Sequence, residues 1–118
     1  MKKILVVDDD PDILYLVKYI LEKAGFDVYT HNTGLGVPAK VTACGPDVIL
    51  LDVMLPGRIG TEVCKELKKD FSIPIIFFSA HANEKKVMQE CNASGFIPKP
   101  FDIKEMIHTI SDLANRAA

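Results

Sequence analysis

The feature that most constrains the fold is a run of four large apolar residues, Val48 to Leu51, that leads directly into the carboxylate of Asp52. Gly45-Pro46 precedes the run and Pro56-Gly57 follows it. A short apolar run between such turn residues predicts a strand that is buried on both faces of a sheet. A carboxylate at the end of a buried strand is unfavourable unless it is paired, hydrated or bound to a metal. We therefore expect partners for Asp52 elsewhere in the chain.

The length and charge of the chain limit the number of domains and the kinds of partner that we expect. With 118 residues we expect one domain, covering residues 1–118. The chain has fourteen Lys and Arg and sixteen Asp and Glu residues, which gives a net charge of −2. Neither the positive nor the negative residues form a long block. We therefore expect no direct nucleic-acid partner and no anionic-membrane surface. The N-terminal apolar run is too short for a signal peptide, and no segment approaches the roughly 20 apolar residues of a membrane span. A cytoplasmic protein is predicted.

The number and spacing of the three cysteines indicate their redox state. Cys44, Cys64 and Cys91 are odd in number, far apart in the chain and without a CxxC pair. This pattern argues against a disulfide framework and against a zinc site. The sequence therefore predicts reduced, partly buried thiols.

Apolar strand-like runs alternate with helical patterns along the whole chain. N-cap residues predict helices that begin after Asp10, Asn83 and Asp102, and a further helix is expected over 61–69. The stretch 32–44 is expected to hold a short or irregular helix, because its glycines and proline discourage the first helical turns. Strands are expected at 3–7, 26–31, 48–51, 73–78 and 95–98.

Alternating strands and helices, with continuously apolar strands, predict an α/β fold. Its doubly wound parallel sheet should have helices on both faces. In such sheets, ligands bind outside the carboxyl ends of the strands. Four of the predicted strands deliver a charged or hydroxyl side chain to that edge: Asp8 and Asp9, Asp52, Ser79, and Lys99.

These residue types together favour phosphoryl chemistry. Three converging carboxylates repel one another, and an all-oxygen site of this kind suits Mg²⁺. Lys99 and the Ser79 hydroxyl can each bind a phosphoryl oxygen. A carboxylate can itself be the nucleophile and form an aspartyl phosphate. The residues alone therefore predict a Mg²⁺-dependent phosphoryl acceptor at Asp52.

Three other functions are compatible with parts of this pattern. A small Mg²⁺-dependent phosphohydrolase acting through an aspartyl phosphate is the main alternative, although 118 residues leave little room for a general acid or a cap over the substrate. A flavodoxin-like electron carrier is disfavoured because Asp8, Asp9 and Asp10 would repel the phosphate of FMN. A purely structural ion cluster does not account for the common location of these side chains at strand ends.

Four motifs, VVDDDP, LLDVMLPG, FFSA and IPKPF, occur in an order and spacing that resemble the receiver domain of two-component response regulators. The resemblance spans essentially the whole chain and implies a flavodoxin-like strand order of 2-1-3-4-5. It implies a phosphoacceptor switch rather than an enzyme, one that assists its own phosphorylation and dephosphorylation. By position, the resemblance implies that Asp52 is the phosphoacceptor, that Asp8 and Asp9 bind the metal, and that the backbone carbonyl of Met54 is a further metal ligand. It implies that Lys99 is the lysine of the family's active site, that the Ser79 hydroxyl and the Phe96 ring carry the switch, and that the peptide bond before Pro100 is cis.

The resemblance also implies partners and regulation. A histidine kinase or histidine phosphotransfer protein would supply the phosphoryl group, and a downstream protein or a fused output domain would read it. Movement of Ser79 and Phe96 would reshape the face formed by the fourth helix, fifth strand and fifth helix, through which a homodimer is possible. Met54 and His81 match the two positions that tune phosphate lifetime. Arg58-Ile59 departs from the acidic residue often found in that loop, and Pro98 before Lys99 is also unusual.

Overall fold

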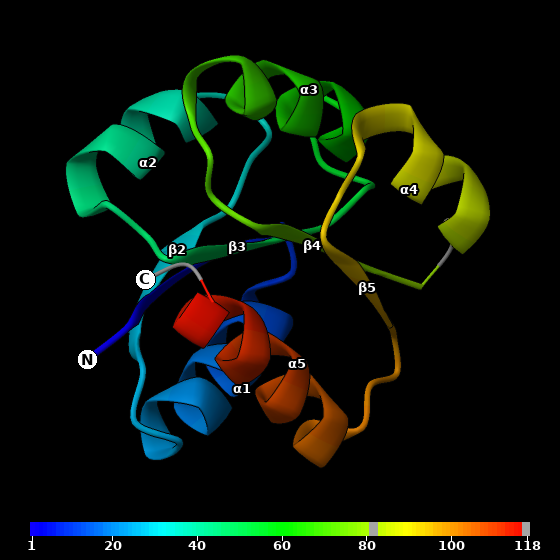
Figure 1. Ribbon diagram of the computed structural model, residues 1–118. Coiled ribbons are helices and arrows are strands. Elements are labelled where there is room, and N and C mark those ends of the chain that lie inside the picture. The colour runs from blue at the N-terminus through cyan, green and yellow to red at the C-terminus, as the bar shows by residue number, and fades with distance from the viewer. Residues whose placement is uncertain (81–82, 117–118) are drawn as a thin grey trace.

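The computed structural model describes residues 1–80 and 83–116, which form one sheet with helices on both of its faces (Figure 1). Strands and helices alternate along this part of the chain, as predicted. The strands are β1 (Lys3–Val7), β2 (Asp27–His31), β3 (Val48–Leu51), β4 (Ile75–Ser79) and β5 (Gly95–Pro98). The helices are α1 (Pro11–Lys23), α2 (Val37–Cys44), α3 (Gly60–Asp70), α4 (Glu84–Cys91) and α5 (Ile103–Arg116).

All strand pairs are parallel, and the order across the sheet is β2-β1-β3-β4-β5. The predicted doubly wound α/β fold and its strand order are therefore confirmed. Helices α1 and α5 cover one face, and α2, α3 and α4 cover the other (Figure 1). The order reverses beside β1, which lies between β2 and β3, so the carboxyl ends of β1 and β3 flank the crevice where such sheets bind ligands.

The core has two layers because successive strand side chains point to opposite faces. Val7, Leu51 and Phe77 belong to the layer under α2, α3 and α4. Their neighbours Val6, Leu50 and Phe78 belong to the layer under α1 and α5. Every residue of β3 and β4 is buried, which accounts for their unbroken apolar sequences.

Short polar side chains cap the starts of α1, α4 and α5, as the sequence predicts. The Asp10 carboxylate accepts hydrogen bonds from the backbone N–H groups of Asp12 (2.9 Å) and Ile13 (3.4 Å). Asn83 accepts from Lys86 (3.0 Å) at the start of α4, and Asp102 accepts from Glu105 (3.0 Å) at the start of α5. These bonds satisfy amides that have no partner within the helix.

Strand β2, helix α3 and strand β4 begin or end one or two residues from their predicted bounds, whereas the stretch 32–44 holds the short helix that was expected. Helix α2 is short and begins only at Val37, after Gly36 adopts a left-handed conformation (φ 73°). Strand β4 begins at Ile75 rather than at residue 73, because Pro74 has no N–H to donate to the sheet. Its carbonyl still accepts from the Ile49 amide (3.0 Å).

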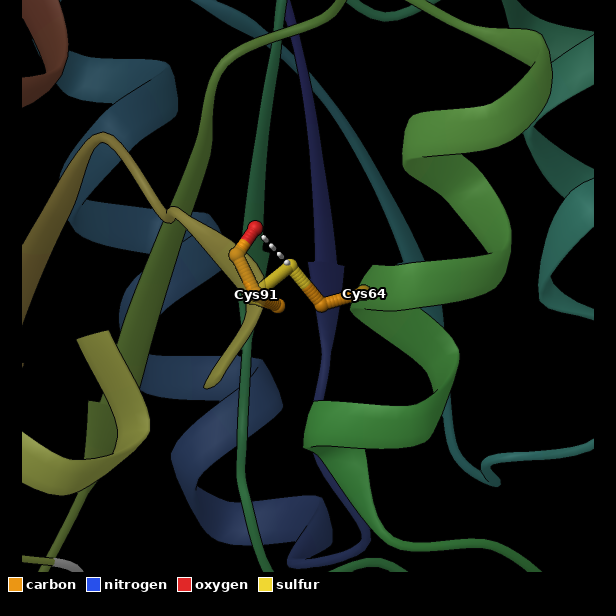
Figure 2. Close-up of a disulfide and its surroundings, with 2 residues drawn as sticks. All are labelled: Cys64 and Cys91. Atoms are coloured by element: carbon orange, nitrogen blue, oxygen red, sulfur yellow. Dashed lines mark hydrogen bonds between the residues drawn. A yellow bond between two sulfur atoms is a disulfide. The ribbon is translucent and has the colours of Figure 1, made fainter. Parts of the chain in front are cut away.

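The prediction that all three cysteines are reduced is wrong for two of them. Cys64 in α3 and Cys91 in α4 form a disulfide (Figure 2), and Cys44 is a free, buried thiol. The error arose because the pairing depends on how α3 packs against α4, not on spacing along the chain. That packing places the two Cα atoms 6.1 Å apart, within the range that a disulfide requires.

None of the helices within residues 1–80 and 83–116 is long and apolar enough to cross a membrane.

Candidate functional site

The sheet register places Asp8 beside Asp52. Val7 of β1 is paired with Leu51 of β3, so the next residue on each strand reaches the same edge of the sheet. The Asp52 amide donates to the Val7 carbonyl (2.9 Å) and the Asp8 amide donates to the His31 carbonyl (3.1 Å). Both carboxylates are thus fixed by the backbone of the central strands, and both residues are buried.

Lys99 joins the two carboxylates. Its backbone follows β5, where its amide donates to the Ser79 carbonyl (3.1 Å). Its side-chain Nζ donates to Asp8 Oδ2 (2.5 Å) and to Asp52 Oδ2 (3.2 Å), and lies 4.7 Å from the centre of the Phe78 ring. One ammonium group therefore faces two carboxylates, and the cluster keeps a net negative charge.

The second oxygen of each carboxylate is held by the turn that follows its strand. Asp8 Oδ1 accepts from the backbone N–H of Asp10 (3.0 Å), and Asp52 Oδ1 accepts from that of Met54 (3.2 Å). Aspartate commonly bonds the backbone two residues further on, and this fixes the side chain as well as the turn. Both carboxylates are therefore oriented before any ligand arrives.

Asp9 adds a third carboxylate to the cluster. Oxygen atoms of Asp8, Asp9 and Asp52 lie within 4.8 Å of one another, and Asp9 is exposed to solvent. An all-oxygen set with excess negative charge fits a hard divalent cation such as Mg²⁺, which retains some of its water ligands. The three residues are suited to hold a metal ion of this kind.

These side chains line one cavity of about 410 Å³ at the carboxyl edge of the sheet. Ser79 is buried at the end of β4 and contributes to its wall, whereas Met54 is largely exposed at its rim. The lining residues are Asp8, Asp9, Asp10, Ile13, Asp52, Met54, Ser79, Ala80 and Lys99. The structure thus brings six of the predicted site residues into a single pocket.

Phe96 and Pro100 line a second cavity rather than that pocket. Phe96 is half-buried on β5 and lines a separate cavity of about 230 Å³, which it shares with Pro100 and several residues of α5. The Lys99–Pro100 peptide bond is cis, as the resemblance implies. His81 lies outside the residues that the structure describes.

Charge and burial shift two pKa values in the cluster. Burial raises the pKa of the Asp52 carboxyl, the charge of Asp8 raises it further, and Lys99 only partly opposes these effects. Burial alone would lower the pKa of Lys99, but its hydrogen bond to Asp8 and the two negative charges outweigh burial and raise it. Lys99 therefore stays charged at neutral pH. An ionised Asp52 lowers the free energy of unfolding, because the folded state favours its protonated form.

This cost predicts that, without divalent metal, Asp52→Asn is more stable than the wild type at neutral pH. The folded state raises the pKa of Asp52, so protonation of Asp52 stabilises the fold. This contribution to the unfolding free energy is complete below the unfolded pKa and is lost as pH rises through the folded pKa. The difference in unfolding free energy should thus be small near pH 4 and increase toward pH 7. Urea unfolding in EDTA at several pH values measures it, with Asp70→Asn as an exposed control. A difference that does not change with pH would contradict this account.

The loop after Asp52 contains two features that the sequence analysis missed. Gly60 begins α3 directly against the backbone of Asp52 and Val53, and its amide donates to the Val53 carbonyl (2.7 Å). Arg58 Nη1 pairs with Glu66 Oε1 (2.7 Å), which ties the loop to α3. The helix expected over 61–69 does not include Gly60, because nothing in the local sequence reveals a close approach of two backbones.

Comparison with known proteins agrees with this arrangement. The family model described as the response regulator receiver domain matches residues 4–111, so the chain belongs to the response regulator receiver domain family. Receiver domains are signalling switches.

Solved structures of the family superpose closely. The BeF₃-activated N-terminal receiver domain of Klebsiella pneumoniae RstA is 26% identical, with a TM-score of 0.91 over 96% of this chain and 98% of that chain. Vibrio cholerae chemotaxis protein CheY4 is 29% identical, with a TM-score of 0.88 over 96% and 98%. Brucella abortus NtrX is 29% identical with a TM-score of 0.87, and there the match covers 98% of this chain but 28% of the longer one.

Proposed function

We propose that Asp52 accepts a phosphoryl group from a histidine kinase or a histidine phosphotransfer protein, and that the resulting aspartyl phosphate switches the domain between two signalling states. One observation supports this most strongly. The buried Asp52 carboxylate is oriented by Met54 N–H and by Lys99 in a pocket of about 410 Å³, next to two further carboxylates. The proposal covers the whole chain, residues 1–118.

In the proposed reaction, a carboxylate oxygen of Asp52 attacks the phosphorus atom of a phosphohistidine. The P–N bond breaks as the new P–O bond forms, and the imidazole leaves with the bonding electron pair. Lys99 Nζ, now shared between Asp8 and Asp52, would donate to an oxygen of the transferring group, and the Ser79 hydroxyl would bind another. Because the backbone already holds Asp52, little rearrangement precedes the attack.

Mg²⁺ would be held by Asp8, Asp9, Asp52 and the backbone carbonyl of Met54. Bound there, it would offset the negative charge that the phosphoryl group brings to the site. The excess of carboxylates over ammonium groups in the pocket supports this requirement. With a cation present, Lys99 is free to turn from the carboxylates toward the phosphoryl oxygens.

The switch would pass from Ser79 to Phe96. The aspartyl phosphate would carry about −1.5 to −2 charges in place of the single carboxylate charge of Asp52 at the end of β3, and its oxygens would draw the neighbouring Ser79 hydroxyl toward them. Phe96 on β5 is only half-buried and lines the cavity of about 230 Å³ beside α5, so it has room to change its packing. Such a change would reshape the face formed by α4, β5 and α5, a shift between two pre-existing packings.

We propose that the face formed by α4, β5 and α5 binds the partner that reads the signal. A downstream protein or a fused output domain would bind it, and so could a second copy of the chain as a homodimer. The longer chain of Brucella abortus NtrX, of which the match covers 28%, supports a role as one part of a larger regulator. We place the protein in the cytoplasm, where a kinase that uses ATP could reach it.

We also propose that Met54 and His81 tune the lifetime of the aspartyl phosphate.

Intact-protein mass spectrometry tests the proposal. After incubation with acetyl phosphate and Mg²⁺, the wild type should gain one phosphoryl group, and the adduct should be absent with EDTA. Asp52→Ala should gain none, whereas the exposed control Asp70→Ala should behave as the wild type. An adduct that persists in Asp52→Ala would refute the assignment. Repeated hydrolysis of phosphomonoesters, with no phosphoryl adduct that outlasts turnover, would instead favour the small phosphohydrolase.

Replacing Ser79 with alanine is expected to separate phosphorylation from switching. The variant keeps Asp52, Lys99 and the acidic cluster, so it should still accept a phosphoryl group. Without the hydroxyl, the pull on the end of β4 is lost, and hydrogen exchange of α4 and α5 should change at least about threefold less upon phosphorylation than in the wild type. A full exchange response in Ser79→Ala would show that this hydroxyl does not carry the signal.

A further inference from the structure

We propose that Cys64 and Cys91 form a reversible redox modification site, whose disulfide fastens α4 to α3 and thereby restrains the switch. The restraint of the switch rests on the proposed function. The attachment of α4 does not, because it follows from the packing of the two helices.

The two cysteines are placed to form and break this bond within the folded protein. Cys64 lies in the middle of α3 and is fully buried, whereas Cys91 is the last residue of α4 and is 7% exposed. Figure 2 shows the sulfur atoms directed toward each other across the gap between the two helices. Cys91 is therefore the less buried of the two residues, at the end of the helix that we expect to open first.

Helix α4 has little else to hold it. Its buried residues are Val87 and Cys91, with Met88 half-buried, and its other residues are exposed and polar. It packs chiefly against α3. A helix with so few buried apolar side chains belongs to the part of a protein that opens locally at low cost. A covalent bond at one of its two buried positions therefore changes its attachment more than the same bond would elsewhere.

The reduced form fits the same backbone. Once the disulfide is broken, side-chain rotation would separate the two sulfur atoms to nonbonded contact. Cys64 Sγ, which lies 3.9 Å from the carbonyl oxygen of Cys91 in the oxidised form, could then donate a weak hydrogen bond to that oxygen. Both cysteines also belong to the apolar core layer under α2, α3 and α4, where a thiol packs as a small apolar group. Neither redox state requires the fold to change, which is the condition for a reversible modification.

The exchange balances with a small-molecule disulfide such as glutathione disulfide as the oxidant. The Cys91 thiolate attacks one sulfur of the oxidant, a mixed disulfide forms, and one thiolate leaves. The Cys64 thiolate then attacks Cys91 Sγ, the internal S–S bond forms and the second thiolate leaves. The protein loses two electrons and two protons, and the oxidant becomes two thiols. A dithiol reverses both steps.

The bond lies where it can affect the proposed switch. Helix α4 connects the end of β4, which carries Ser79, to β5, which carries Phe96. Cys91 is followed by Asn92 in a left-handed conformation (φ 58°), and the amide of Ser94, just before β5, donates to the carbonyl of Ile75 at the start of β4 (2.8 Å). The disulfide thus fixes the end of α4 that precedes β5 to α3, the helix that follows the loop after Asp52.

The first test uses the unphosphorylated protein. In buffers of defined glutathione redox ratio, thiol alkylation and mass spectrometry should show Cys64 and Cys91 changing together and reversibly. Hydrogen exchange of α4 should be about tenfold faster in the reduced than in the oxidised protein, with exchange of α2 unchanged. Cys91→Ala should match the reduced form in both redox buffers, and Cys44→Ala should respond as the wild type. Independent alkylation of the two thiols, a bond that resists reduction in the folded state, or equal exchange in both forms would overturn the proposal.

The second test adds acetyl phosphate and Mg²⁺ to both redox forms. Both should gain the phosphoryl adduct, and the phosphorylation-dependent change in α4 exchange should be about tenfold smaller in the oxidised protein. Equal changes in the two forms would refute the restraint of the switch. No adduct in either form would refute the proposed function instead, and the attachment of α4 would still be decided by the first test.

Discussion

Replacing Lys99 with alanine is expected to slow the phosphorylation of Asp52 by acetyl phosphate about 100-fold or more, the usual effect of removing one preorganised donor from a developing negative charge. Lys99 is the basic residue among those that line the pocket, and its Nζ already contacts both Asp8 and Asp52. The transferring group brings negative charge into a site that holds three carboxylates. Without the ammonium group, repulsion would oppose the approach of the donor.

Initial rates of adduct formation, measured by intact mass at saturating Mg²⁺, give this effect. Lys104→Ala removes an exposed lysine from α5 and is the matched control, since it should react at the wild-type rate. Thermal unfolding of both variants verifies that they are folded under the assay conditions. A Lys99→Ala rate within threefold of the wild type would show that the ammonium group does not assist the transfer.

Gly60→Ala is expected to lower the free energy of unfolding by roughly 3 kcal/mol, at the upper end of the usual effect of overpacking. A Cβ atom at this position would lie 2.8 Å from the Val53 Cα and closer still to the Asp52 carbonyl oxygen. Both contacts are with backbone, so no side chain can turn away to relieve them. Helix α3 would have to move off the loop that carries the phosphoacceptor, and the rate of phosphorylation should therefore fall together with stability.

Urea unfolding and the acetyl phosphate assay measure the two effects. Gly95→Ala is the matched control, because a Cβ there would meet Ile76 and Thr109 side-chain atoms at ordinary distances of 3.8 to 3.9 Å. It should change the free energy of unfolding by less than about 1 kcal/mol. If Gly60→Ala is as stable as Gly95→Ala, the close approach of α3 to Asp52 does not constrain the site.

The convergence of the site residues could be predicted because it depends on strand ends, which the sequence marks clearly. Buried parallel strands are continuously apolar, so the first polar residue after each run, such as Asp8 or Asp52, identifies the carboxyl edge of the sheet. The N-caps Asp10, Asn83 and Asp102 were equally visible, because each bonds an amide two or three residues ahead. Local chemistry of this kind can be predicted from sequence.

Features that depend on how distant segments pack could not be predicted in the same way. The disulfide joins residues 27 positions apart, and in sequence Cys64 and Cys91 look only like small apolar residues on the inner faces of two helices. The need for glycine at position 60 follows from the position of the β3–α3 loop relative to α3. The bonds of Lys99 Nζ also depend on the register of the strands, although the lysine itself was found.

The most direct test of the central claim is to locate the phosphoryl group chemically. Borohydride reduces an acyl phosphate to the alcohol, so an aspartyl phosphate becomes homoserine, a change that peptide sequencing by mass spectrometry assigns to one residue. After treatment with acetyl phosphate and Mg²⁺, then borohydride, we predict homoserine at position 52 and at no other aspartate. Homoserine at position 8 or 9, or phosphorylation without any homoserine, would contradict the assignment of Asp52 as the phosphoacceptor.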